Sequence, residues 1–126
     1  MINYILLIGG LLGLTSVAAG AYIDHVLRYV VDTKILSMVY IGLHYHELYA
    51  VIISAIGLVH PKNNSKLLKL SAWIFILGAL LFSFSIYTTA LTGTLVWIKL
   101  TPIGGTLLMI GWFFLICTSI NFIKKN

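Results

Sequence analysis

The chain has 126 residues, of which 60% are hydrophobic and 9% are charged, and its formal net charge at pH 7 is +5. A soluble domain typically carries about 25% charged residues, so this chain has too few charges to cover a water-facing surface. Its basic residues lie at the ends of apolar runs and not among polar residues, which argues against nucleic-acid binding. The composition therefore predicts an integral membrane protein whose surroundings are the lipid bilayer.

The first apolar run predicts a transmembrane helix over residues 2–23. A cleaved signal peptide is the alternative, but no Lys or Arg precedes the run, and the run is long enough to span a bilayer. The next segment, 24–39, is mixed. Asp24, Arg28 and Asp32 follow at four-residue spacing on one helical face, and apolar residues fill most of the rest. This pattern predicts a short amphipathic interfacial helix, or else a loop packed over the bundle.

Three further apolar runs predict transmembrane helices over residues 40–59, 68–91 and 102–122. Pro61 should end the second of them, because proline cannot continue a helical hydrogen-bond ladder. Gly93 marks a break after the third, and Pro102 suits the first turn of the last helix. The predicted fold class is therefore all-α, with one transmembrane domain over residues 1–126 that forms a four-helix bundle.

The basic residues predict the orientation of the bundle. With four spans, both termini and the middle loop lie on one side of the membrane. That side carries five of the eight Lys and Arg residues, namely Lys62, Lys66, Lys69, Lys124 and Lys125. The other side carries Arg28, Lys34 and Lys99. Because cytoplasmic loops are enriched in Lys and Arg, both termini are expected in the cytoplasm.

Small residues recur on one face of each predicted span. Membrane helices associate through close van der Waals contact, so such faces mark the places where helices approach one another. The spacing of four, three and four residues in the first span keeps its small residues on one side. The predicted packing residues are Gly9, Gly13, Ser16, Gly20, Ser54, Gly78, Gly104 and Gly111.

The second predicted span contains ionisable residues at membrane depth. Glu47 lies about seven residues into that span, or roughly 10 Å of helix rise. A carboxylate there is costly against lipid. Ala50 and Ser54 follow on nearly the same side, so Glu47 is expected to face the bundle, with His44 beside it and His46 pointing nearly the opposite way. Two roles are open for Glu47: a proton-linked site, or a hydrogen-bonded group that fixes packing.

Two histidines raise the question of a bound metal or haem. His44 and Glu47 could hold one ion if a third ligand such as His25 joined them. A membrane haem would need two histidines from facing helices, for which His25 and His44 are candidates. The ligand set is incomplete, so the sequence predicts no metal and no cofactor, with His25 interpreted as an interfacial hydrogen-bonding residue.

Hydroxyl groups in the third span complete the candidate site. Ser83 and Tyr87 are four residues apart and share one helical face. No base and orienting group accompany the serine, so no catalytic residue is predicted. The candidate polar cluster consists of His25, His44, Tyr45, His46, Glu47, Ser83 and Tyr87.

Several of these motifs, taken in order, resemble the YgdD/YwdK-like family of uncharacterised bacterial membrane proteins. The resemblance rests on Gly20-Ala21-Tyr22 with His25, Gly42-Leu43 with Tyr45, Leu81-Phe82-Ser83 with Ser85 and Tyr87, and Thr101-Pro102-Ile103-Gly104-Gly105 with Gly111-Trp112. It covers almost the whole chain and implies a four-span protein of the bacterial plasma membrane. It implies no reaction. The chain departs from the pattern in its second helix, at His46, Glu47 and Tyr49.

Three functions follow from these features. The favoured one is a non-enzymatic packing, lipid-binding or accessory subunit, because each span has a packing face and no catalytic set occurs. Its partner would be a second copy of the chain or another membrane protein. The alternatives are a small oligomeric proton-coupled transporter that uses Glu47, and an intramembrane haem or redox subunit that uses His25 and His44.

Overall fold

The computed structural model describes the backbone of residues 1–125 and the side chains of residues 1–121. Within this part the chain is helical apart from short connections, and it contains no strand. The elements are α1 (Tyr4–His25), α2 (Thr33–Asn63), α3 (Lys66–Ala79), α4 (Ser85–Thr92) and α5 (Thr101–Lys125), with 3-10 turns at Leu27–Tyr29 and Trp97–Leu100 and a π-helical turn at Leu80–Phe84. The π-helical turn joins α3 and α4 into one rod. Four segments are long and apolar enough to cross a membrane, which confirms the predicted all-α class: Tyr4–Tyr29, Thr33–Asn63, Lys66–Thr92 and Trp97–Asn121.

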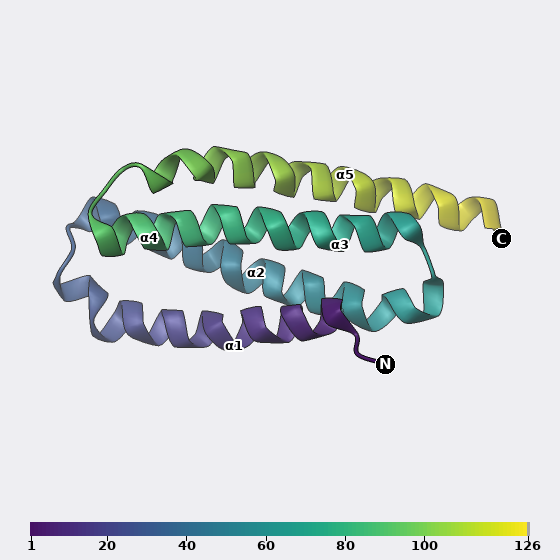
Figure 1. Ribbon diagram of the computed structural model, residues 1–126, viewed down its shortest axis with the longest axis horizontal. Coiled ribbons are helices and arrows are strands. Elements are labelled where there is room, and N and C mark those ends of the chain that lie inside the picture. Colours follow the sequence, from purple (N-terminus) through teal and green to yellow (C-terminus); the bar gives the residue numbers. More distant parts are fainter. Residues whose placement is uncertain (126) are drawn as a thin grey trace.

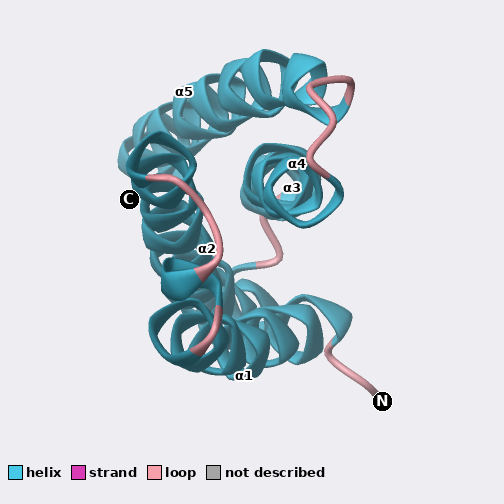
Figure 2. Ribbon diagram, turned by 90° about the vertical axis from the view of Figure 1, so that its left-hand side faces the viewer, coloured by secondary structure: helices cyan, strands magenta, loops and turns pink. Residues whose placement is uncertain are grey.

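The long helices run side by side, and the marked N- and C-terminal ends lie at the same end of the molecule (Figure 1). α1 packs along α2, α5 packs along α3, and the α3–α4 rod lies against α2. Viewed end-on, α1, α2 and α5 follow an arc with the α3–α4 rod inside it (Figure 2). Only 22% of the apolar window of the first and last spans is buried, against 44% for the two central spans. The outer faces of α1 and α5 are therefore open to the surroundings.

The predicted amphipathic interfacial helix over part of 24–39 does not exist as a separate element. α2 begins at Thr33, well before residue 40, because the Asp32 side chain accepts a hydrogen bond from the Ile35 backbone N–H at 2.8 Å and caps the helix. Asp24 instead accepts a hydrogen bond from the Tyr40 hydroxyl, which joins the end of α1 to α2. The apolar pattern gave no sign of this early start, since the capped turn is mixed in composition.

The prediction that Pro61 ends the second span is also wrong. α2 continues through Pro61 and stops before Asn64, whose φ of 46° is left-handed. Proline has no N–H to donate to the carbonyl of Gly57, four residues earlier. The side-chain amide of Asn3 donates to that carbonyl instead, at 2.6 Å. Asn3 also caps α1 by accepting from the Leu6 backbone N–H at 3.1 Å, so one side chain serves two helix ends.

Glycines set the closest helix approaches. A Cβ atom added to Gly57 would lie 2.7 Å from the backbone nitrogen of Leu6, and one added to Gly9 would overlap Ser54. α1 and α2 therefore cross with their backbones nearly touching. On the other side of the molecule, Gly104 lies directly against the backbone of Phe82. Such contacts let the backbones of α1 and α2, and those of α5 and the α3–α4 rod, approach closely.

The remaining predicted packing residues form two groups, with Gly13 as an exception. Gly78 and Gly111 lie in the α3–α5 contact, where added Cβ atoms would meet Leu108 and the ring of Phe75. Ser54, Ser16 and Gly20 lie between α1 and α2. Gly13 differs, because nothing approaches within 4 Å of a Cβ placed there. Gly13 sits about 100° around the helix from the buried Leu12 and faces outward.

Candidate functional site

His46 is one of the largest fully buried side chains in the described part of the chain and has polar partners on two other helices. Its side chain is only 2% exposed. The ring Nε2 is 3.1 Å from the hydroxyl oxygen of Thr15 on α1, and Nδ1 is 3.1 Å from the hydroxyl of Tyr87 on α4. One imidazole therefore bridges three helices.

The hydrogen-bond partners allow both nitrogens of a neutral ring to be satisfied. The Thr15 hydroxyl lies 2.9 Å from the Leu11 carbonyl and 3.1 Å from the Leu12 carbonyl, and it can donate to either. When it does so, it accepts from Nε2 of His46, and Nδ1 accepts from the Tyr87 hydroxyl. In this arrangement each ring nitrogen has a partner inside the bundle.

The π-helical turn shapes the other side of this cluster. Ser83 lies within the turn, is fully buried, and donates to the Gly42 carbonyl of α2 at 2.8 Å. Tyr87 lies one helical turn further on and reaches His46. The ring of Phe84 lies 5.3 Å from that of His46, measured between centroids. As expected, Ser83 and Tyr87 share a face, and that face is the one packed on α2. Single π-helical turns inside α-helices are frequently found at functional sites.

The expectation that Glu47 faces the bundle and His46 faces away is wrong. Glu47 is exposed, whereas His46 is buried. The buried face of α2 includes Val39, Ile53 and Gly57 together with His46. Glu47 is one residue further, about 100° around the helix from the centre of that face. Ala50 and Ser54 lie in the contact with α1, but the Glu47 side chain lies on the open side of the two helices, so proximity to these small residues did not place it inside.

Glu47 lines an open groove of about 620 Å³ between the outer sides of α1 and α2. Gly10, Gly13 and Val17 form the α1 side, and Val51 lies beside Glu47 on α2. Glu47 is near the middle of the 31-residue α2, deeper than its predicted place seven residues into a span. The groove lining contains no basic residue, and no ion pair with Glu47 forms within the described chain. A carboxyl group thus stands near the middle of a membrane-length helix and forms no ion pair within the described chain.

The other predicted site residues are less closely joined. His25 and His44 are exposed, and Tyr45 is half-buried with its ring 4.5 Å from that of Phe82. Among residues 1–121, no three His, Cys, Asp or Glu side chains are close enough to hold a metal ion. The weak metal candidates His25, His44 and Glu47 are therefore not brought together.

Thr15 and the pair of Tyr49 and Trp112 were missed by the sequence analysis. Tyr49 is buried, and its hydroxyl accepts a hydrogen bond from the Trp112 indole at 2.8 Å, linking α2 to α5. Tyr49 lies three residues after His46, so the buried face of α2 carries both polar groups. Gly42 and Ile53 recur on the same face of α2 at helical spacing, and this periodicity is the sequence signal that could have identified Tyr49 as buried.

A family model described as a protein of unknown function (DUF423) matches residues 19–105. The chain belongs to this family. A UPF0382 membrane protein from Haemophilus influenzae is 38% identical over 112 residues, which cover 89% of this chain and 90% of that protein. The UPF0382 inner membrane protein YgdD of Escherichia coli K12 is 27% identical over 124 residues, which cover 98% and 95%. No solved structure matches.

These relatives confirm the resemblance to the YgdD-like family noted from the motifs. The DUF423 match spans the end of α1, the whole of α2 to α4 and the start of α5, so it includes His46, Glu47, Ser83 and Tyr87. Relatives named as membrane proteins and four membrane-length helices together identify this DUF423 chain as a membrane protein.

Proposed function

We propose that the chain acts by association inside the membrane and not by turnover, as a non-enzymatic packing or accessory protein whose α1–α2 groove receives a second copy of itself. The observation that carries this proposal is the position of Glu47. It is exposed in an open groove near the middle of α2, where lipid offers a carboxyl group no hydrogen-bond partner.

The shape of the groove supports a second copy as the occupant. A two-fold interface must present hollows and projections on one and the same surface. Gly10 and Gly13 leave hollows here, while Val17, Val51 and Leu58 project, with exposed fractions between 62% and 72%. A helix from a second copy can therefore enter close to the glycines while its own glycines receive the projecting side chains.

The depth of Glu47 supports the same occupant. Two copies inserted with the same orientation place identical residues at identical depth, so two Glu47 side chains meet beside the symmetry axis. No Lys or Arg of the groove lies at that depth. A pair of carboxyl groups that shares a proton satisfies both without any basic residue. The phosphate and amine of a lipid headgroup remain at the bilayer surface and cannot reach the midplane.

Gly10→Leu is expected to weaken dimerisation at least tenfold, because the new side chain fills the groove. Glu47→Leu is expected to weaken it about threefold to eighteenfold, the range that follows from about 0.6–1.7 kcal/mol for a hydrogen bond between membrane helices. Glu47→Gln should keep the dimer, since two amides can pair as donor and acceptor. Energy transfer between labelled copies in vesicles, followed as lipid dilutes the protein, measures these changes.

Gly105→Leu on α5 is the matched control, because it adds the same side chain outside the groove and should leave dimerisation unchanged. A wild-type chain that stays monomeric at every dilution would contradict the proposal. So would a Gly10→Leu chain that dimerises like the wild type.

The second candidate is a small proton-coupled carrier, and the same exposed carboxyl group favours it, since a membrane carboxyl group that is open to its surroundings can take up and release protons. Sealed liposomes with an imposed pH gradient separate the two functions. Proton movement that disappears in Glu47→Gln would favour the carrier, whereas association predicts equal, background movement in both. The haem candidate gains no support, because His25 and His44 are both exposed.

For the orientation, we infer that both termini face the cytoplasm of a bacterial cell, on the basis of the Lys and Arg distribution. The end of the bundle that carries the termini also carries the α2–α3 connection. A membrane-impermeant thiol reagent should therefore fail to label Ser65→Cys in intact cells and should label Thr94→Cys, each in a chain where Cys117 is replaced by alanine. Labelling of Ser65→Cys alone would reverse the orientation.

A further inference from the structure

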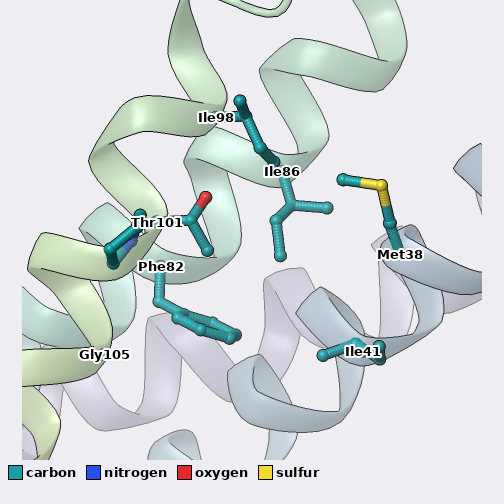
Figure 3. Close-up of a pocket in the computed structure, with 8 residues that line it drawn as sticks. Met38, Ile41, Phe82, Ile86, Ile98, Thr101 and Gly105 are labelled. Atoms are coloured by element: carbon teal, nitrogen blue, oxygen red, sulfur yellow. The ribbon is translucent and has the colours of Figure 1, made fainter.

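A second cleft lies between α2 and α5, on a different side of the molecule from the Glu47 groove. Its volume is about 390 Å³, within the range of small-ligand sites. Figure 3 shows side chains from α2 facing side chains from the start of α5, with Phe82 and Ile86 between them. The residues that line it include Met38, Ile41, Phe82, Ile86, Ile98 and Pro102.

The cleft exists because α2 and α5 meet at one level and separate at another. The hydrogen bond between Tyr49 and Trp112 holds them together deeper in the bundle. Towards Pro102 the two helices are separated, and Phe82 of the π-helical turn forms the floor. Gly105 contributes no side chain to the wall, although a Cβ there would lie at an ordinary 3.7 Å from the Phe82 ring. The space beside Gly105 is thus open to a ligand, and no backbone atom blocks it.

The chemistry of the lining is that of a hydrocarbon site. Thr101 supplies the one hydroxyl group among the lining residues, and that hydroxyl is already bonded to Ser85 at 2.6 Å. No charged side chain enters the cleft. A ligand that fills it can therefore offer only apolar surface to the protein.

Two lysines lie close in the chain to residues that line the cleft, one on α2 and one just before α5. Lys34 is the second residue of α2 and lies one helical turn before Met38, so the two share a face. Lys99 precedes α5 and is adjacent to Ile98. Both are exposed, and neither forms an ion pair within residues 1–121. The carboxylate of Asp32 at this end is engaged in the α2 cap.

We propose that this cleft binds an anionic phospholipid, with one acyl chain between α2 and α5 and the phosphate between Lys34 and Lys99. Lys34 precedes the lining residues of α2, and Lys99 precedes those of α5, so both lysines stand nearer the helix ends than the apolar lining does. That is the order of phosphate and acyl chain in a bilayer leaflet. Basic side chains between transmembrane helices bind acidic headgroups in this way. A second copy carries Asp24 and Asp32 at this end, but each of these carboxylates already accepts a hydrogen bond, from the Tyr40 hydroxyl and from the Ile35 backbone.

Native mass spectrometry of protein extracted from vesicles of equal phosphatidylglycerol and phosphatidylcholine tests the proposal. The wild-type chain should retain one phosphatidylglycerol, at least fivefold more often than phosphatidylcholine. The double variant Lys34→Gln/Lys99→Gln should retain both lipids about equally, because the headgroup preference is lost. Gly105→Leu should retain less of both lipids, because the acyl-chain cleft is filled. The lysine variant changes only exposed residues, so it also serves if Gly105→Leu fails to fold.

Two control variants test whether the lipid binds in this cleft and not elsewhere on the bundle. Lys62→Gln/Lys66→Gln removes the same charge at the opposite end of the bundle and should leave the lipid preference intact. Gly10→Leu fills the Glu47 groove and should also leave it intact, so failure of the dimer proposal and failure of the lipid proposal give different results. Equal retention of the two lipids by the wild type would overturn the proposal. An equal loss of preference in both lysine variants would do the same.

Discussion

Gly104→Ala is expected to destabilise the folded chain by about 3 kcal/mol, at the upper end of the range for overpacking a tight contact. A Cβ at this position would lie 2.8 Å from both the Gly78 carbonyl oxygen and the Phe82 Cα, and closer still to the Phe82 backbone nitrogen. These are backbone atoms of the α3–α4 rod, so no side-chain rotation relieves the overlap. α5 must move away from the rod, and the close contacts along that interface weaken together.

The neighbouring glycine gives a matched control. Gly105→Ala adds the same methyl group, but its nearest contact would be the Phe82 ring at 3.7 Å, an ordinary van der Waals distance. Its stability should be unchanged or slightly increased, since alanine is the better helix former. Reversible unfolding in mixed detergent micelles, followed by circular dichroism, measures both variants. Equal stability of the two variants would show that α3 and α5 do not approach at Gly104.

His46→Ala is expected to cost about 2–4 kcal/mol of folding free energy, because it removes a buried ring and leaves a cavity between three helices. It also leaves the Tyr87 hydroxyl without the acceptor it uses in the folded chain. Tyr87→Phe should cost less, about 1 kcal/mol, since only one hydrogen bond between membrane helices is lost and the ring remains. The same unfolding experiment measures the stability lost in each of the two variants.

His44→Ala, two residues earlier on α2, is the control for His46. His44 is exposed, so its removal should change stability by less than about 0.5 kcal/mol. If His44→Ala were as harmful as His46→Ala, the imidazole of His46 would not be the bridge between Thr15 and Tyr87. A double variant of His46 and Tyr87 should lose less than the sum of the single losses, because the two side chains share one hydrogen bond.

The sequence predicted the number of helices because each span needs an unbroken apolar run. It did not predict where α2 begins and ends. The start depends on one hydrogen bond of Asp32, and the end on Asn3 replacing the donor that Pro61 lacks. Hydropathy registers neither interaction, since both depend on single polar side chains, one of which lies far away in the chain.

The candidate site, like the helix bounds, was predicted from the sequence only in part. Polar residues in apolar runs identified His46, Glu47, Ser83 and Tyr87, and the structure joins three of them into contacts between α2 and the α3–α4 rod. Which of two adjacent residues faces inward depends on where the contact between α1 and α2 ends, and a stripe of small residues does not mark that limit. The π-helical turn shifts the helical phase of the residues that follow it, yet Ser83 and Tyr87 still share the face that packs on α2.

The pairing of α1 with α2, and of the α3–α4 rod with α5, has a consequence for the order of synthesis. Asn3 with Gly57 and Asp24 with Tyr40 both lie within the first hairpin, so these bonds can form before α3 leaves the ribosome. The two hydrogen bonds of the His46 ring cannot both form at that stage. Its Nε2 can already meet Thr15, but its Nδ1 waits for Tyr87 on the second hairpin. The unpaired Nδ1 of His46 therefore favours packing of the second hairpin against the first. The hydrogen bond to Tyr87 that stabilises the finished protein also guides its assembly.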